Sequence, residues 1–193
     1  MWFDILIQAI GFVALAVNII AVQFNKYRTI ILLKTIGSLL FVVQYIFLHA
    51  YTGMIMDIIG SIRNIIFSLN VKNNRSNKMP VIIFSFLTAI LGTTTIILTW
   101  DISKIVWTND LKIATFVMVM ISILSIFAKL ISTISYSLKD PHKMRMLNLP
   151  SASCWLVYNF ITFSIAGFIS EIMTMCSIVI AEIRFRKTKK IIE

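Results

Sequence analysis

The chain has 193 residues, of which 59% are hydrophobic and 13% are charged, and its formal net charge is +10. Soluble domains are about half apolar and a quarter charged, so one water-soluble core cannot bury this much apolar surface. The composition excludes an ordinary soluble protein and predicts a single all-α membrane domain over residues 1–193. The basic residues lie in short segments between apolar runs, so we expect no nucleic-acid partner.

Seven apolar segments follow one another along the chain, each close to the length that a membrane-crossing helix needs. The first carries Asp4 and no basic flank and is too long for a secretory signal, so we expect it to be retained as a span. The last two are nearly continuous, and we place the division between them at Ser164–Gly167. The predicted spans are 2–22, 30–49, 52–70, 80–99, 112–136, 149–165 and 166–184.

Lysine and arginine are distributed unequally between the two sides that these spans define. Thirteen of them fall in the connections and the tail on one side, against Lys104 and Lys112 on the other. Because basic residues are enriched in cytoplasmic connections, we expect the N-terminus outside and the C-terminus in the cytoplasm. The thirteen are Lys26, Arg28, Lys72, Arg75, Lys78, Lys139, Lys143, Arg145, Arg184, Arg186, Lys187, Lys189 and Lys190.

The chain resembles itself when it is shifted by 114 residues. Phe41 then meets Trp155, and Asp57 meets Glu171. Matched spans are four apart, an even number, so both halves cross the membrane in the same sense and are related by an axis along the membrane normal. The sequence therefore predicts seven transmembrane helices arranged as two parallel three-helix repeats and a linker helix. The expected parts are repeat 1 over 1–72, the linker helix over 79–99, an outer interfacial segment over 100–111 and repeat 2 over 112–193.

The outer segment contains apolar residues at helical spacing between two tryptophans. Trp100 and Trp107 suit the headgroup region, where indole rings are enriched. We therefore expect a short helix that lies in the membrane interface and anchors the protein.

Polar residues recur at helical spacing on one face of several predicted spans, and most of these stripes obey the 114-residue register. Such faces are too polar for lipid, so we expect them to point inward. Helix packing alone is one explanation, because small and hydroxyl side chains let helices approach and bond. The stripes are Gln8, Gly11 and Asn18; Ser122, Ser125, Lys129 and Ser132; Gly53, Asp57, Gly60 and Asn64; Gly167, Glu171 and Thr174; and Trp155, Asn159 and Thr162.

Four ionisable residues lie well inside predicted spans: Asp57, Arg63, Lys129 and Glu171. A charge at mid-bilayer costs about 3 kcal/mol, so these residues must pair with one another or line water. They comprise two charges of each sign, and structural ion pairing and a polar solute pathway both stay open. Lys34 lies one turn from the cytoplasmic end of its span, so we expect it to snorkel to the interface.

The second half contains a pattern of aromatic, amide, glycine and acidic residues that resembles the YgjV family of bacterial inner-membrane proteins. The first half is similar, with Asn25-Lys26-x-Arg28 before the second span and the stretch from Asp57 to Arg63 in the third. The resemblance implies an inner-membrane location but no substrate and no functional residues. The second-half pattern is Cys154-Trp155-x-x-x-Asn159-Phe160, then Ser164-Ile165-x-Gly167, Glu171 and Ile183-Arg184-Phe185.

The three-one-three layout is also similar, by architecture, to the SWEET sugar transporters and the PnuC vitamin-precursor transporters. The sugar members carry a kink proline in several helices of each half, whereas here only Pro150, at the start of the sixth span, is near such a position. Asn159 resembles the pocket asparagine of that family's sixth helix. We expect Asn64, rather than Tyr45, to be its partner from the first half.

The leading hypothesis is a transporter or facilitator for a small polar solute, with its pocket between the halves. The alternative is a non-transporting accessory or sensor protein whose polar stripes only pack helices. No enzyme motif is present, so we expect no catalysis, metal or cofactor; the expected partners are the lipid bilayer and a small polar solute, and a homo-oligomer stays open. The predicted pocket residues are Asp57, Arg63, Asn64, Lys129, Trp155, Asn159 and Glu171.

Overall fold

The computed structural model describes residues 2–24, 26–99 and 111–192, and over these residues the chain forms seven α-helices and no strands. The predicted all-helical fold is confirmed. The predicted interfacial segment, 100–111, lies almost entirely outside the described residues. The helices are α1 (Trp2–Gln23), α2 (Tyr27–Phe47), α3 (Tyr51–Lys72), α4 (Lys78–Thr99), α5 (Leu111–Ser137), α6 (Pro141–Ile161) and α7 (Ile165–Ile192).

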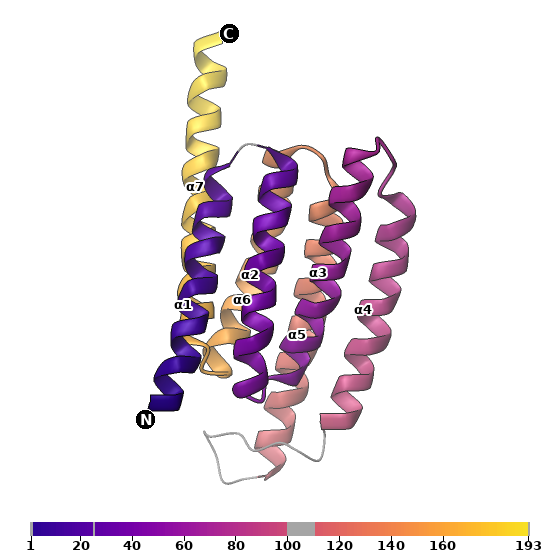
Figure 1. Ribbon diagram of the computed structural model, residues 1–193, viewed down its shortest axis with the longest axis vertical. Coiled ribbons are helices and arrows are strands. Elements are labelled where there is room, and N and C mark those ends of the chain that lie inside the picture. Colours follow the sequence, from indigo (N-terminus) through magenta and orange to yellow (C-terminus); the bar gives the residue numbers. More distant parts are fainter. Residues whose placement is uncertain (1, 25, 100–110, 193) are drawn as a thin grey trace.

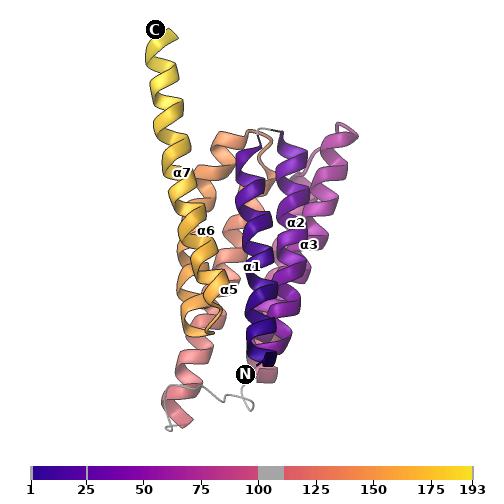
Figure 2. The same ribbon diagram turned by 60° about the vertical axis from the view of Figure 1, so that its left-hand side comes forward.

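The helices stand side by side in two layers (Figure 1). One layer contains α1, α2 and α3, and the other contains α7, α6 and α5 in the facing order, because α1 contacts α7 and α3 contacts α5. Helix α4 packs against α3 and α5 at one edge of the bundle. Figure 2 shows the two layers from the side, with α7 extending beyond the rest of the bundle toward the C-terminus.

The surface of the bundle is apolar and its interior is polar, the reverse of a soluble protein. Large apolar side chains of α4 are widely exposed, among them Phe86 at 67% and Ile97 at 69%. In contrast, Arg63 is 1% exposed and Asn64 is 2% exposed. Exposed apolar surface on this scale is stable only against lipid. The predicted inward orientation of the polar stripes is confirmed, with only Gln8, Thr162 and Glu171 half-buried.

Four helices have the length and hydropathy to cross a membrane: α2, α3, α4 to Ile97, and α5 from Phe116. Shorter apolar stretches, Ile5–Ala21 and Ile165–Ile180, lie within α1 and α7. Helix α6 carries more polar residues than the others. It lies between α5 and α7, where neighbouring helices cover its sides.

The sixth and seventh helices differ from their predicted bounds of 149–165 and 166–184. Helix α6 begins eight residues earlier, because Pro141 occupies the first turn and the carboxylate of Asp140 caps it by accepting a hydrogen bond from the His142 amide. Pro150 consequently lies in the middle of α6 rather than at its start. The break falls before Ile165, and α7 runs on to Ile192, because the backbone bonds of a helix continue past its apolar stretch.

The link from α2 to α3 has the same backbone form as the link from α6 to α7. Each contains one residue with positive φ, His49 at 55° and Phe163 at 56°. In each, an amide two residues later along the turn bonds back to a carbonyl in the helix, Ala50 to Tyr45 and Ser164 to Asn159. These bonds close a left-handed helix end, which returns the chain sharply into the next helix.

Candidate functional site

A cavity of about 70 Å³ lies between the two layers of helices. This volume is several times what one buried water molecule needs. Its wall is formed largely by polar and charged side chains from α1, α2, α3, α5, α6 and α7. The structure brings all seven residues of the predicted pocket into that wall: Asp57, Arg63, Asn64, Lys129, Trp155, Asn159 and Glu171.

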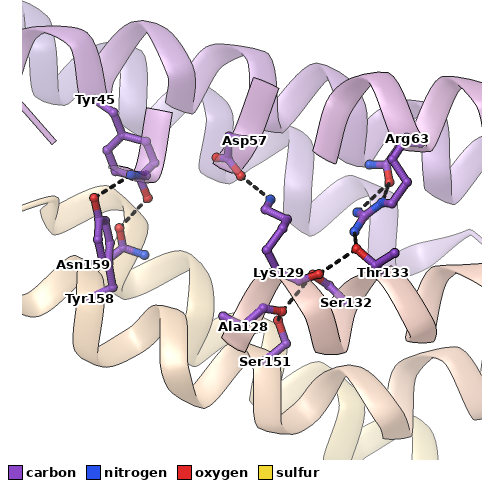
Figure 3. A network of polar contacts seen from close by, with 12 residues as sticks. Tyr45, Asp57, Arg63, Ala128, Lys129, Ser132, Thr133, Ser151, Tyr158 and Asn159 are labelled. Atoms are coloured by element: carbon purple, nitrogen blue, oxygen red, sulfur yellow. Dashed lines mark hydrogen bonds and ion pairs between the residues drawn. The ribbon is translucent and has the colours of Figure 1, made fainter. Parts of the chain in front are cut away.

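An ion pair between Lys129 of α5 and Asp57 of α3 crosses the middle of the site (Figure 3). The Lys129 ammonium lies 2.6 Å from Asp57 Oδ1, and both residues are buried. Gly60, one turn along α3 from Asp57, gives the ammonium its room, because a Cβ at this position would lie 2.7 Å from Lys129 Nζ. The pair removes two of the predicted buried charges from lipid by direct contact.

Arg63 is held without a carboxylate in contact. Its guanidinium donates from Nε and Nη2 to Asn64 Oδ1, at 3.1 and 2.8 Å, and from Nη1 to Thr133 Oγ1 at 2.7 Å. It also lies 4.9 Å from the ring centroid of Tyr136, a favourable cation–π geometry. Arg63 therefore contributes a fixed positive charge whose direct partners are neutral.

Three side chains from the two layers meet at the end of the site nearest the link between α2 and α3 (Figure 3). The Tyr45 hydroxyl donates to Asn159 Oδ1 at 2.6 Å, and the Tyr158 hydroxyl accepts from the Gly53 amide at 2.8 Å. The prediction that Asn64 is the partner of Asn159 is wrong. Asn64 is used by Arg63, while Tyr45, on α2, faces Asn159 directly.

Aromatic rings complete this end of the cavity. Tyr158 makes edge-to-face contacts with Tyr45, at 6.0 Å between centroids, and with Trp155, at 5.2 Å. The ammonium of Lys129 lies over the Trp155 ring, 5.2 Å from its centroid. The ring that was expected to stack on a solute therefore already binds a cation.

Lys34 of α2 lines the cavity, so the prediction that it snorkels to the interface is wrong. Its ammonium and the carboxylate of Glu171, on α7, lie within electrostatic range of each other. In the described part of the chain, neither group forms a hydrogen bond or an ion pair within 4.0 Å. An inward rotamer toward Glu171 replaces the outward one, because the carboxylate offers the amine an attractive field inside the bundle.

Sequence reasoning missed four other residues of the wall, each of which is polar or aromatic. Tyr45 is separated from Asn159 by 114 residues, so the register of the halves was a usable signal for it. Tyr136 and Asn148 lie near the predicted ends of their spans and gave no signal. Ser38 lies on α2, one turn from Lys34, where the apolar neighbours hid it.

The described residues contain no group of three or more histidine, cysteine, aspartate or glutamate side chains that could hold a metal ion. The donors in the wall are amines, a guanidinium, amides and hydroxyls instead. These groups bind polar solutes through hydrogen bonds and charge.

A helical bundle with an apolar exterior and charged residues around an internal cavity defines an integral membrane protein. Comparison with known families assigns it further. Residues 5–189 match the family model of the bacterial inner membrane protein YgjV, and the chain belongs to this family. No curated protein and no solved structure matches the chain. The predicted family and its inner-membrane location are therefore confirmed.

Proposed function

We propose that this protein is a carrier or facilitator for a small polar solute, with its binding site in the cavity between two parallel three-helix repeats. The observation that carries the proposal is the cavity itself, whose wall contains Asp57, Arg63, Lys129 and Glu171 at the centre of a membrane bundle. Charges in this position are costly and mark solute and ion pathways in membrane proteins. The role is binding and passage, without catalysis.

Several local matches at a separation of 114 residues support the two repeats. Helices α2 (Tyr27–Phe47) and α6 (Pro141–Ile161) begin and end 114 residues apart, as do the positive-φ residues His49 and Phe163. The contacts of α1 with α2 and α7 parallel those of α5 with α6 and α3. In this arrangement α4 is the linker helix, and the likeness to SWEET and PnuC transporters is one of layout.

The two-fold relationship also accounts for which side chains meet. Residues that lie on a two-fold axis contact their own equivalents. Tyr45 and Asn159 are equivalent positions and share a hydrogen bond. Farther from the axis, Tyr158 approaches the Ala50 carbonyl, and its equivalent Gln44 accepts from Ser164, the equivalent of Ala50.

We propose that all seven helices cross the membrane, with the N-terminus outside and the C-terminus in the cytoplasm. The unequal distribution of lysine and arginine supports this orientation. The ends of α3 and α6 that carry Lys72 and Lys143 would then face the cytoplasm, and the links at His49 and Phe163 would face outside.

A second candidate function is a non-transporting accessory or sensor protein. One observation favours it: Asp57 bonds Lys129, Arg63 bonds Asn64 and Thr133, and Tyr45 bonds Asn159. Groups that satisfy one another in this way also stabilise a bundle without any solute.

Uptake by liposomes that contain the purified protein separates the two functions. We expect wild-type protein to accelerate entry of a subset of small polar solutes, and Asn159→Ala and Asp57→Asn to abolish it while the protein remains folded. Asn73→Ala, at an exposed position after α3, is the matched control and should transport normally. If no small solute enters faster than it enters protein-free liposomes, the accessory function is correct.

A further inference from the structure

The cavity contains more positive than negative formal charge. Its ionisable wall residues are Lys34, Arg63 and Lys129 against Asp57 and Glu171, three cations and two carboxylates. The formal sum is +3 − 2 = +1 for the described residues of the wall. The surplus arises because Lys34 faces the cavity, so the four buried charges predicted from the sequence are not the whole set.

The carboxylates do not neutralise the three cations by contact. Asp57 is committed to Lys129 at 2.6 Å. Glu171 and Lys34 attract each other without touching. Arg63 rests on an amide oxygen, a hydroxyl and aromatic rings, all of which are formally neutral.

An unbalanced buried cation is unfavourable in a membrane bundle, because the low dielectric does not screen it. A bound anion would remove the imbalance. Two kinds of donor are present for it: the Lys34 ammonium, and the two of the five guanidinium N–H groups of Arg63 that its three hydrogen bonds leave unused. Ammonium and guanidinium groups are the usual partners of carboxylates and other oxyanions in proteins.

We propose that the cavity selects a small anion that carries one negative charge, with Lys34 and Arg63 as the groups that receive it. The inference rests on the proposed function for the location of the site, and it adds the charge class of the solute. A monocarboxylate or another small oxyanion has the required charge. The Asp57–Lys129 pair stays intact and forms a neutral part of the wall.

Three probes of nearly equal shape and different charge test the proposal: acetate, acetamide and acetamidinium. The full chain is purified in detergent, in a buffer whose only other anion is the bulky gluconate, and Tm is measured as each probe is titrated at constant ionic strength. A ligand that binds only the folded protein raises Tm in proportion to its occupancy. We expect acetate to raise Tm saturably and to bind at least about tenfold more tightly than acetamide, with no effect of acetamidinium.

Two variants locate the selectivity. Lys34→Gln brings the formal charge of the wall to zero, so the preference for acetate over acetamide should fall about tenfold. Lys34→Arg retains the charge and should retain the preference. The comparison of the three probes on wild-type protein decides the question even if Lys34→Gln does not fold.

The proposal is overturned if acetamide binds as tightly as acetate, if acetamidinium binds more tightly, or if none of the three binds. Glycine adds a further test, because its ammonium offsets its carboxylate. Tighter binding of glycine than acetate would show that Lys34 and Glu171 act as a zwitterion site, and would also overturn selection by net charge. If acetate binds but no solute enters liposomes, the carrier function fails while this inference stands; transport of neutral solutes alone gives the opposite result.

Discussion

The Tyr45 hydroxyl donates a hydrogen bond to Asn159 Oδ1 across the two layers of the bundle, at 2.6 Å. The two residues are 114 positions apart, and both are 2% exposed. A direct bond between equivalent positions of two related halves places them at the axis between the halves. The contact also closes one end of the cavity, so it joins the proposed duplication to the proposed site.

Removing one partner of this bond should destabilise the folded protein. We expect Tyr45→Phe and Asn159→Ala each to lower the free energy of unfolding by about 1–3 kcal/mol, because a buried polar group loses its partner. In a double-mutant cycle the two losses should not add, with a coupling of about 1 kcal/mol. Denaturant unfolding in detergent micelles measures both quantities. Tyr51→Phe is the control: it removes a hydroxyl that contacts His49 at the surface and should change little.

The Asp57–Lys129 pair should behave as a buried ion pair, in which losing one member is worse than losing both. We expect Asp57→Asn or Lys129→Met alone to cost about 3 kcal/mol of unfolding free energy, because the remaining charge is left uncompensated. The double variant should recover most of that loss. Equal or larger destabilisation in the double variant would contradict the direct pairing. The same unfolding measurement serves.

Gly60 should be required for the position of Lys129 rather than for the helix. A Cβ there would lie 2.7 Å from Lys129 Nζ, so Gly60→Ala should push the ammonium away from Asp57 and lower stability by about 1–2 kcal/mol. The loss should disappear in the Lys129→Met background. On the same helix Ser61→Ala is a matched control, because its buried hydroxyl has no hydrogen-bond partner among the described residues and its removal should be neutral or stabilising. A loss that persists in the Lys129→Met background would assign Gly60 to helix packing alone.

Covalent closure at Tyr45 and Asn159 should stop passage through the protein. In a chain whose native cysteines are replaced (Cys154→Ala and Cys176→Ala), the pair Tyr45→Cys and Asn159→Cys should form a disulfide on oxidation. We expect this bond to abolish solute uptake by liposomes and reduction to restore it. Uptake that is unchanged by complete oxidation would show that this end of the bundle does not open.

The membrane class, the helical fold and the seven central residues of the wall were predictable because each depends on local sequence. An apolar run of about 20 residues must be a helix in lipid, and a buried charge such as Asp57 must face inward. The start of α6 was not, because the cap at Asp140 and the proline after it outweighed the hydropathy pattern on which the prediction relied. A capping signal was present in the sequence and would have corrected the bound.

The orientation of Lys34 and the partner of Asn159 depend on contacts between helices that are far apart in sequence. A lysine one turn from a helix end can extend outward or turn inward, and only the position of Glu171 on α7 decides between them. Likewise, Asn64 and Tyr45 are equally plausible partners by helical spacing. The choice follows from Asn64 being held by Arg63, a contact between adjacent residues that periodicity does not reveal.

The central claim is that the polar interior is a hydrated site open to a solute rather than a packed core. In the chain without native cysteines, Ser38→Cys places a thiol in the cavity wall, and Ser61→Cys places one at a buried position of α3 outside that wall. Labelling by a membrane-impermeant thiol reagent is then measured in right-side-out and inside-out vesicles. We predict that Ser38→Cys reacts from at least one side and that Ser61→Cys reacts from neither. Absence of reaction at Ser38→Cys from both sides would contradict the account.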